Sequence, residues 1–141
     1  MKIRTLLTAA ILSAALVPGA LAETITYNAD LKASEEVPPT SSNGSGKAEA
    51  AYDTATKVLK WKVTYSGLTG PATMGHIHGP AARGQNAPVV VPFDKPGSPI
   101  EGSVKLSDAQ AADLKAGKLY VNIHTAANKS GEIRGQLTPV K

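Results

Sequence analysis

The sequence predicts an all-β domain, an antiparallel Greek-key β-sandwich or barrel with one short helix. About eight short segments alternate apolar with polar residues, a spacing typical of strands with one buried face. Pro, Gly, Ser and Asn cluster between these segments, where they favour turns. A single segment has both a start and a stop signal for a helix. Short strands with frequent turns are typical of sandwiches and barrels.

The apolar positions define the expected elements. In residues 57–65, Leu59, Trp61 and Val63 alternate with lysines and a threonine, as in a strand with one face in water. The run 88–93 is apolar throughout and predicts a buried strand. The other expected strands cover residues 25–33, 47–52, 72–78, 100–106, 119–124 and 132–137. A Ser107/Gln110 capping box and a stop at Gly117 predict the helix, over about residues 107–116.

The first residues have the pattern of an export signal. Lys2 and Arg4 precede the uncharged apolar run 5–16, and Ala20-Leu21-Ala22 forms a small-x-small cleavage site before Glu23. The apolar run is short for a membrane-spanning helix. The sequence therefore predicts a cleaved signal peptide and a protein that is exported, either periplasmic or secreted.

Cleavage divides the chain into a signal peptide, residues 1–22, and a single domain, residues 23–141. No second apolar run has spanning length, so we expect no membrane span in the mature chain. Two of the 15 basic residues and none of the 11 acidic residues lie in the signal, so cleavage lowers the net charge from +4 to +2. This charge is too weak to favour a nucleic-acid partner. The absence of Cys excludes disulfides and thiolate metal sites.

Several motifs occur in the order found in a known family. They are Gly75-His76-Ile77-His78-Gly79-Pro80-Ala81, Asn86-Ala87-Pro88-Val89-Val90, Leu106-Ser107, Tyr120-Val121-Asn122-Ile123-His124-Thr125 and Gly131-Glu132-Ile133-Arg134-Gly135-Gln136-Leu137. In this order they resemble the CHRD (chordin-type) domain, as found singly in exported bacterial proteins. The resemblance implies an extracytoplasmic setting and no settled enzymatic activity. Because chordin is a signalling antagonist, it also suggests an extracytoplasmic protein partner.

All three histidines lie in these motifs. His76 and His78 are two residues apart on an expected strand, so their side chains leave the same face with Cα atoms about 6–7 Å apart. His124 ends another expected strand and adds a third nitrogen if the two strands are neighbours. Copper/zinc superoxide dismutases build part of their copper site from a similar pattern. We therefore predict that His76, His78 and His124 bind one metal ion.

Imidazole ligands suit copper, zinc or nickel, and the Irving–Williams order favours Cu(II). Copper is the expected metal and zinc the alternative. Two other functions stay open: an interaction or matrix module whose histidines are structural, and a mononuclear copper redox enzyme resembling superoxide dismutase. Three histidines are too few for a binuclear copper–zinc site, so we expect no enzyme and assign no catalytic residue.

The positions of five further residues predict their surroundings. Met74 shares a face with the two strand histidines but is too far from His78 to bind the same ion, so we expect it in the core. Glu35 and Glu36 indicate a solvated loop. Glu132 and Arg134 are two residues apart, which favours an ion pair on an exposed face; alternatively, Arg134 leans over the metal site and attracts anions.

Signal cleavage gives the first testable prediction. The exported protein should begin at Glu23, because Ala20-Leu21-Ala22 matches the residues that signal peptidases select. Intact-mass spectrometry of protein from the exported fraction measures this directly. A mass that still contains Met1 to Ala22 would contradict export by a cleaved signal.

Overall fold

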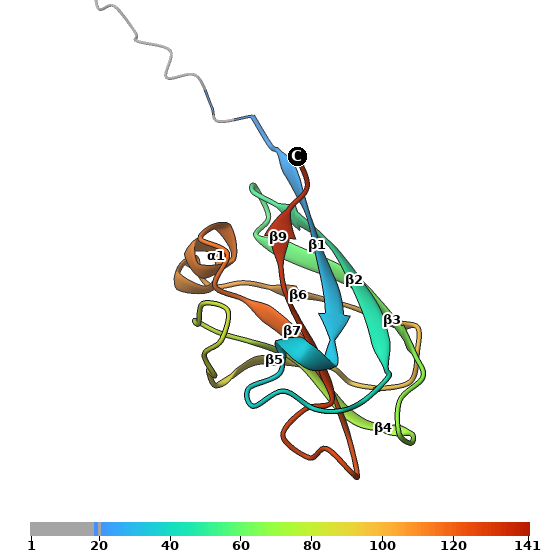
Figure 1. Cartoon of the computed structure of the whole chain (residues 1–141). Coiled ribbons are helices and arrows are strands. Elements are labelled where there is room, and N and C mark those ends of the chain that lie inside the picture. Colours follow the sequence, from blue (N-terminus) through green and yellow to red (C-terminus); the bar gives the residue numbers. More distant parts are fainter. Residues whose placement is uncertain (1–18, 20) are drawn as a thin grey trace, which may run out of the picture.

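Nine strands form a single sheet in the computed structural model, which describes residues 19 and 21–141 (Figure 1). Almost all of the expected signal peptide lies outside the described residues. The strands are β1 (Thr24–Lys32), β2 (Ser45–Asp53), β3 (Val58–Ser66), β4 (Ala72–His78), β5 (Val89–Pro92), β6 (Ile100–Lys105), β7 (Tyr120–Thr125), β8 (Ile133–Gln136) and β9 (Thr138–Pro139). A 3-10 turn, η1 (Ala33–Glu35), and one helix, α1 (Asp108–Lys115), complete the described elements.

The strands run antiparallel in the order β5-β4-β7-β8-β1-β2-β3-β6, with β9 paired to β1. Neighbours such as β4 and β7 are distant in the sequence, so the chain crosses over as Greek-key connections require. The two outer strands, β5 and β6, approach each other: Val91 and Gly102 line one small cavity. Trp61 stacks on Phe93 there, with ring centroids 5.4 Å apart. The sheet is thus a nearly closed barrel, and the predicted all-β class is confirmed.

The sequence patterns correspond closely to most elements. β4 has the expected bounds, and Ser107 and Gln110 form both hydrogen bonds of the capping box at the start of α1. The fully buried strand expected at 88–93 is wrong, because β5 is an edge strand that pairs only with β4. Val89 is 47% exposed there, whereas Val91 is buried. β9 has only two residues and was not expected from the sequence.

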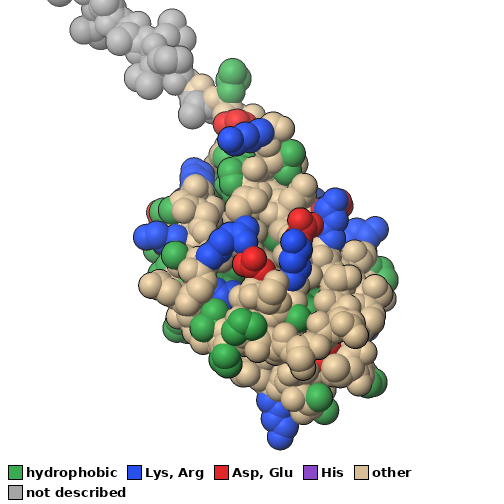
Figure 2. Space-filling model, viewed as in Figure 1, with side chains coloured by type: hydrophobic (Ala, Val, Ile, Leu, Met, Phe, Trp, Pro, Cys, Tyr) green, Lys and Arg blue, Asp and Glu red, His purple; other side chains and the backbone are tan. Residues whose placement is uncertain are grey.

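The surface agrees with a small net charge. On the face shown in Figure 2, basic and acidic side chains are interspersed. Among the residues that the structure describes, no helix has the length and apolar character needed to cross a membrane.

β7 is buried on both faces, which determines where the functional residues lie. Val121 and Ile123 point into the apolar core with Ile77 and Ile133. The alternate residues of β7 face the outside of the barrel, yet all six of its residues are buried. Three connections contribute residues over this outer face: residues 36–44, 79–88 and 126–132, here called the covering loops. A polar layer therefore lies between the sheet and the loops.

Glu132 fastens two of the covering loops, 36–44 and 126–132, to each other and to the turn at Thr69. Its carboxylate accepts hydrogen bonds from Ser42 Oγ (2.9 Å), the Thr69 amide (2.9 Å), Thr125 Oγ1 (2.7 Å) and Asn128 Nδ2 (2.9 Å), and from the Thr69 hydroxyl. Burial alone would raise the pKa of Glu132, but these hydrogen bonds outweigh it and lower the pKa to about 2.

The exposed Glu132–Arg134 ion pair expected from the sequence is therefore wrong. Both side chains are buried, with exposures of 0% and 2%. Glu132 faces neutral donors, whereas the Arg134 guanidinium donates to Asn86 Oδ1 at 3.0 Å and to the Gln85 carbonyl. Alternation alone could not show that loops cover this face.

We predict that Glu132→Gln lowers the free energy of unfolding by about 2–3 kcal/mol at pH 7, since the amide replaces a charged acceptor that meets several donors.

The lowered pKa of Glu132 also makes the stability of the protein depend on pH. Its contribution is complete above about pH 4.5, the ordinary pKa, and is lost as the pH falls towards about 2.

Urea unfolding between pH 2 and 7 measures both effects. Glu101→Gln is the control, because Glu101 is exposed and forms a weak surface ion pair with Lys62 at 3.8 Å. This variant should change the free energy of unfolding by no more than about 0.5 kcal/mol. Equal stabilities for Glu132→Gln and Glu101→Gln would contradict the assigned role of Glu132.

Candidate metal centre

The candidate centre lies on the outer face of β4 and β7. Alternation places His76 and His78 on this face of β4 and places Asn122 and His124 on the same face of β7. The register pairs His76 with Asn122 and Met74 with His124. The condition set by the sequence, that the two histidine strands be neighbours, is met.

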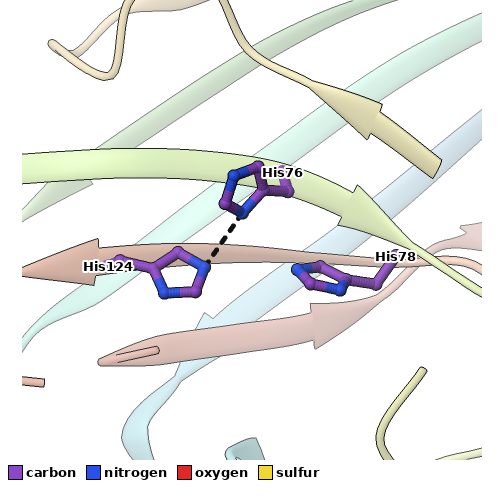
Figure 3. Close-up of side chains that lie close together, drawn as sticks. All are labelled: His76, His78 and His124. Atoms are coloured by element: carbon purple, nitrogen blue, oxygen red, sulfur yellow. Dashed lines mark hydrogen bonds between the residues drawn. The ribbon is translucent and has the colours of Figure 1, made fainter. Parts of the chain in front are cut away.

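The three imidazoles converge, as Figure 3 shows. One nitrogen from each of His76, His78 and His124 lies within 4.8 Å of the other two. Nδ1 of His76 is 3.0 Å from Nε2 of His124. The ring centroid of His124 is 4.8 Å from that of His76 and 6.3 Å from that of His78. The fold thus brings together the three histidines that the sequence motifs single out.

Covering-loop carbonyls determine the tautomers of two rings. Nδ1 of His78 is 2.9 Å from the Ala87 carbonyl, and Nδ1 of His124 is 2.8 Å from the Lys129 carbonyl. A carbonyl oxygen can only accept, so each Nδ1 holds the proton and each neutral ring has a lone pair on Nε2. Nε2 of His78 is buried and has no hydrogen-bond partner among the described residues.

The surroundings keep these rings in the form that binds metals. Burial, followed by the nearby His124 and His78, lowers the pKa of His76 to about 4. Burial also lowers the pKa of His78, although the hydrogen bond to Ala87 opposes this effect. Both imidazoles are therefore neutral at pH 7, and a neutral ring nitrogen is the usual form of a histidine ligand.

A stack of side chains supports His78 from behind. Its ring lies parallel to the Tyr120 ring, with centroids 5.0 Å apart and an interplanar angle of 3°. The Arg134 guanidinium lies 3.5 Å from the Tyr120 centroid. Arg134 therefore packs on Tyr120 and holds the loop of Asn86, whereas the sequence had suggested, as one alternative, that it leans over the metal site.

A buried acidic residue beside the centre was missed by the sequence interpretation. Glu36 was expected in a solvated loop, but it is only 5% exposed, whereas its neighbour Glu35 pairs with Arg83 at 2.8 Å. Burial raises the pKa of Glu36 to about 7, opposed by Arg134 and by a contact with Asn122. The sequence has no periodic signal for this burial, because Glu36 lies outside the strands.

The interpretation of Met74 as a core residue is also wrong. Its side chain is 47% exposed, although it lies opposite His124 in the register. The reason is that Met74 shares the outer face of β4 with the histidines and lies beyond the part of this face that the covering loops bury. The thioether is thus accessible to solvent close to the centre.

The geometry allows one chemistry above others. One nitrogen of each ring lies within reach of a common cation, and loop carbonyls hold the His78 and His124 rings in position. Nδ1 of His76 and Nε2 of His124 share one proton in a 3.0 Å hydrogen bond, so metal binding there requires that proton to leave. Three imidazole nitrogens suit a borderline metal ion such as Zn(II) or Cu(II).

Comparison with known proteins agrees with the sequence motifs. The family model for the CHRD domain matches residues 27–137, almost four fifths of the chain. The match runs from within β1 to the end of β8 and includes all three histidines. No match to the chain was found among curated proteins or among solved structures. Because the family model covers well over half of the sequence, the chain belongs to the CHRD domain family.

Proposed function

We propose that this CHRD-domain protein is exported and binds one metal ion, copper in the first place, through His76, His78 and His124 without catalysing a reaction. The observation that best supports binding is the buried Nε2 of His78. A buried polar atom without a partner costs free energy, of the order of 1–3 kcal/mol. An ion bound to this nitrogen removes the cost.

The distances are close to those of a metal centre. Two ligands at about 2.0–2.1 Å from one ion lie about 3–4 Å apart. The His76–His124 separation of 3.0 Å already falls in this range. The limiting separation of 4.8 Å within the cluster exceeds the upper end of this range by about 0.8 Å, so binding requires a ring to rotate towards the ion.

Copper is proposed ahead of zinc on chemical grounds. The three donors are imidazoles, and an imidazole site binds Cu(II) more tightly than the other divalent first-row ions when geometry does not oppose it. Export, proposed from residues 1–22, would place the centre outside the cytoplasm, in the periplasm or the medium. Zinc remains the alternative metal.

We predict that unmutated protein from the exported fraction binds one Cu(II) per chain and that His→Ala at position 76, 78 or 124 weakens binding more than about 100-fold. Loss of a direct ligand should exceed the 10–100-fold effect typical of supporting residues. The losses should not add in double variants, because the three ligands act as one unit. Calorimetric titration with Cu(II) and Zn(II) measures these effects.

Met74→Leu is the matched control, because Met74 lies on the same strand face but is not one of the three ligands. It should change Cu(II) affinity less than about threefold, since a thioether prefers Cu(I). If the protein binds no stoichiometric metal, and the His→Ala variants lower Tm equally with and without copper, the histidines are structural. That result would favour the interaction-module function instead.

A further inference from the structure

Asn122 lies at the middle of the histidine cluster. It is 3% exposed, faces His76 in the β4–β7 register and is two residues from His124 on the same strand face. Its Oδ1 is 3.0 Å from Nε2 of His124, and its amide also contacts His78. Every ring of the centre is therefore a direct or cross-strand neighbour of this one amide.

The contact between Asn122 Oδ1 and His124 Nε2 brings two lone pairs close together. The proton of His124 is on Nδ1, where it is donated to the Lys129 carbonyl, so Nε2 presents a lone pair. Oδ1 of Asn122 also presents only lone pairs. Two acceptors 3.0 Å apart repel each other unless a proton or a metal ion lies between them. A divalent metal ion accepts both imidazole nitrogen and amide oxygen as ligands, so an ion here would replace the repulsion with two bonds.

The other end of the amide faces Glu36. A Cβ atom placed on Gly131 would lie 2.4 Å from Glu36 Oε1 and 2.7 Å from Asn122 Nδ2, so these two atoms flank the same point of the backbone. The contact is loose, because Glu36 Oε1 is buried and has no hydrogen-bond partner among the described residues. The two atoms that face each other here are thus an acceptor, Oε1 of Glu36, and a donor, Nδ2 of Asn122. This arrangement directs Oδ1 towards the imidazoles.

We propose that Asn122 Oδ1 is a fourth ligand, which makes the centre a three-histidine, one-amide site, and that Glu36 positions the amide. This inference rests on the proposed metal-binding function. A cation on Oδ1 polarises the amide and makes Nδ2 a better donor towards Glu36 Oε1. One ion would then bind His78 Nε2 directly and, through the amide, favour a hydrogen bond to Glu36 Oε1, the two unpaired atoms on either side of Asn122.

A fourth oxygen ligand determines which metal the centre prefers. Amide oxygen is a harder donor than thioether or thiolate sulfur, and it suits divalent ions better than Cu(I). The centre should therefore hold Cu(II) or Zn(II) in preference to Cu(I), with Asn122 as the residue that produces the preference.

The test compares Asn122→Leu with the unmutated protein. Leucine has a similar size but offers no donor atom. We expect Cu(II) affinity to fall about 10–100-fold, less than for loss of a histidine ligand because amide oxygen is a weaker donor to copper than imidazole nitrogen, while Cu(I) affinity changes less than about threefold. Because a supporting residue can lower affinity by a similar factor, the diagnostic result is a shift in the g and hyperfine values of the Cu(II) EPR spectrum. Asn122→Asp keeps an oxygen donor and should retain Cu(II) binding. Glu36→Gln should weaken Cu(II) binding about 10-fold and leave the set of ligand atoms unchanged.

Gln136→Leu is the matched control. Gln136 is another buried amide on the same sheet face, but it donates to the Ala81 and Gly117 carbonyls, away from the centre. This variant should lower Tm without changing the EPR spectrum. If Asn122→Leu does not fold, a crystal structure of the unmutated protein with copper decides the question: Oδ1 should lie within about 2.5 Å of the ion.

The outcomes separate this inference from the proposed function. If the His→Ala variants lose copper but Asn122→Leu keeps its affinity within twofold and its EPR spectrum, Asn122 is not a ligand and metal binding by three histidines stands. A copper-bound structure with Nδ2, and not Oδ1, facing the ion would also overturn the inference. If unmutated protein binds no metal, both proposals fail.

Discussion

The candidate centre depends on hydrogen bonds from two imidazole rings to carbonyls of the covering loops. Ala87 and Lys129 accept the Nδ1 protons of His78 and His124, so both rings present Nε2 to the same small volume. The two carbonyls keep these positions only if the covering loops keep theirs. Arg134 holds the Ala87 loop through Asn86, and Glu132 holds the Lys129 loop through Asn128. Two buried charges, Arg134 within β8 and Glu132 just before it, thus maintain the protonation pattern of the histidines.

The charged groups around the polar layer favour a cation on the side of Glu36 and disfavour one on the side of Arg134. Arg134 approaches His78 across Tyr120 and opposes protonation of that imidazole. Glu36 lies on the other side of Asn122 as a potential source of negative charge. A bound cation therefore meets neutral nitrogen donors, with a carboxyl group behind the amide. The imidazoles contact the Asn122 amide, and the amide in turn faces the Glu36 carboxyl group. Such a chain of contacts is typical of supporting residues that orient metal ligands.

How much the sequence could predict differs between strands and loops. A spacing of two residues correctly located the strands, including both bounds of β4, and it placed His76 and His78 on one face. The burial of that outer face was not predictable, because it comes from loops that contribute no periodic pattern. Met74, Glu36 and Glu132 were misjudged for this common reason, since their exposure depends on where the covering loops begin and end.

Gly131 links the path of one loop to the chemistry of the centre. Its φ of 127° lies in the region that glycine adopts far more readily than other residues, and a side chain there would collide with Glu36 and Asn122. The backbone can therefore pass between these two side chains only at a glycine. From this point the loop continues to Glu132, whose hydrogen bonds fasten it to the Ser42 and Thr69 segments. The strands determine the direction in which each histidine side chain points. The loop at Gly131 determines how deeply the histidines are buried and how Glu36 contacts the Asn122 amide. A change in this loop would therefore alter the centre without replacing a ligand.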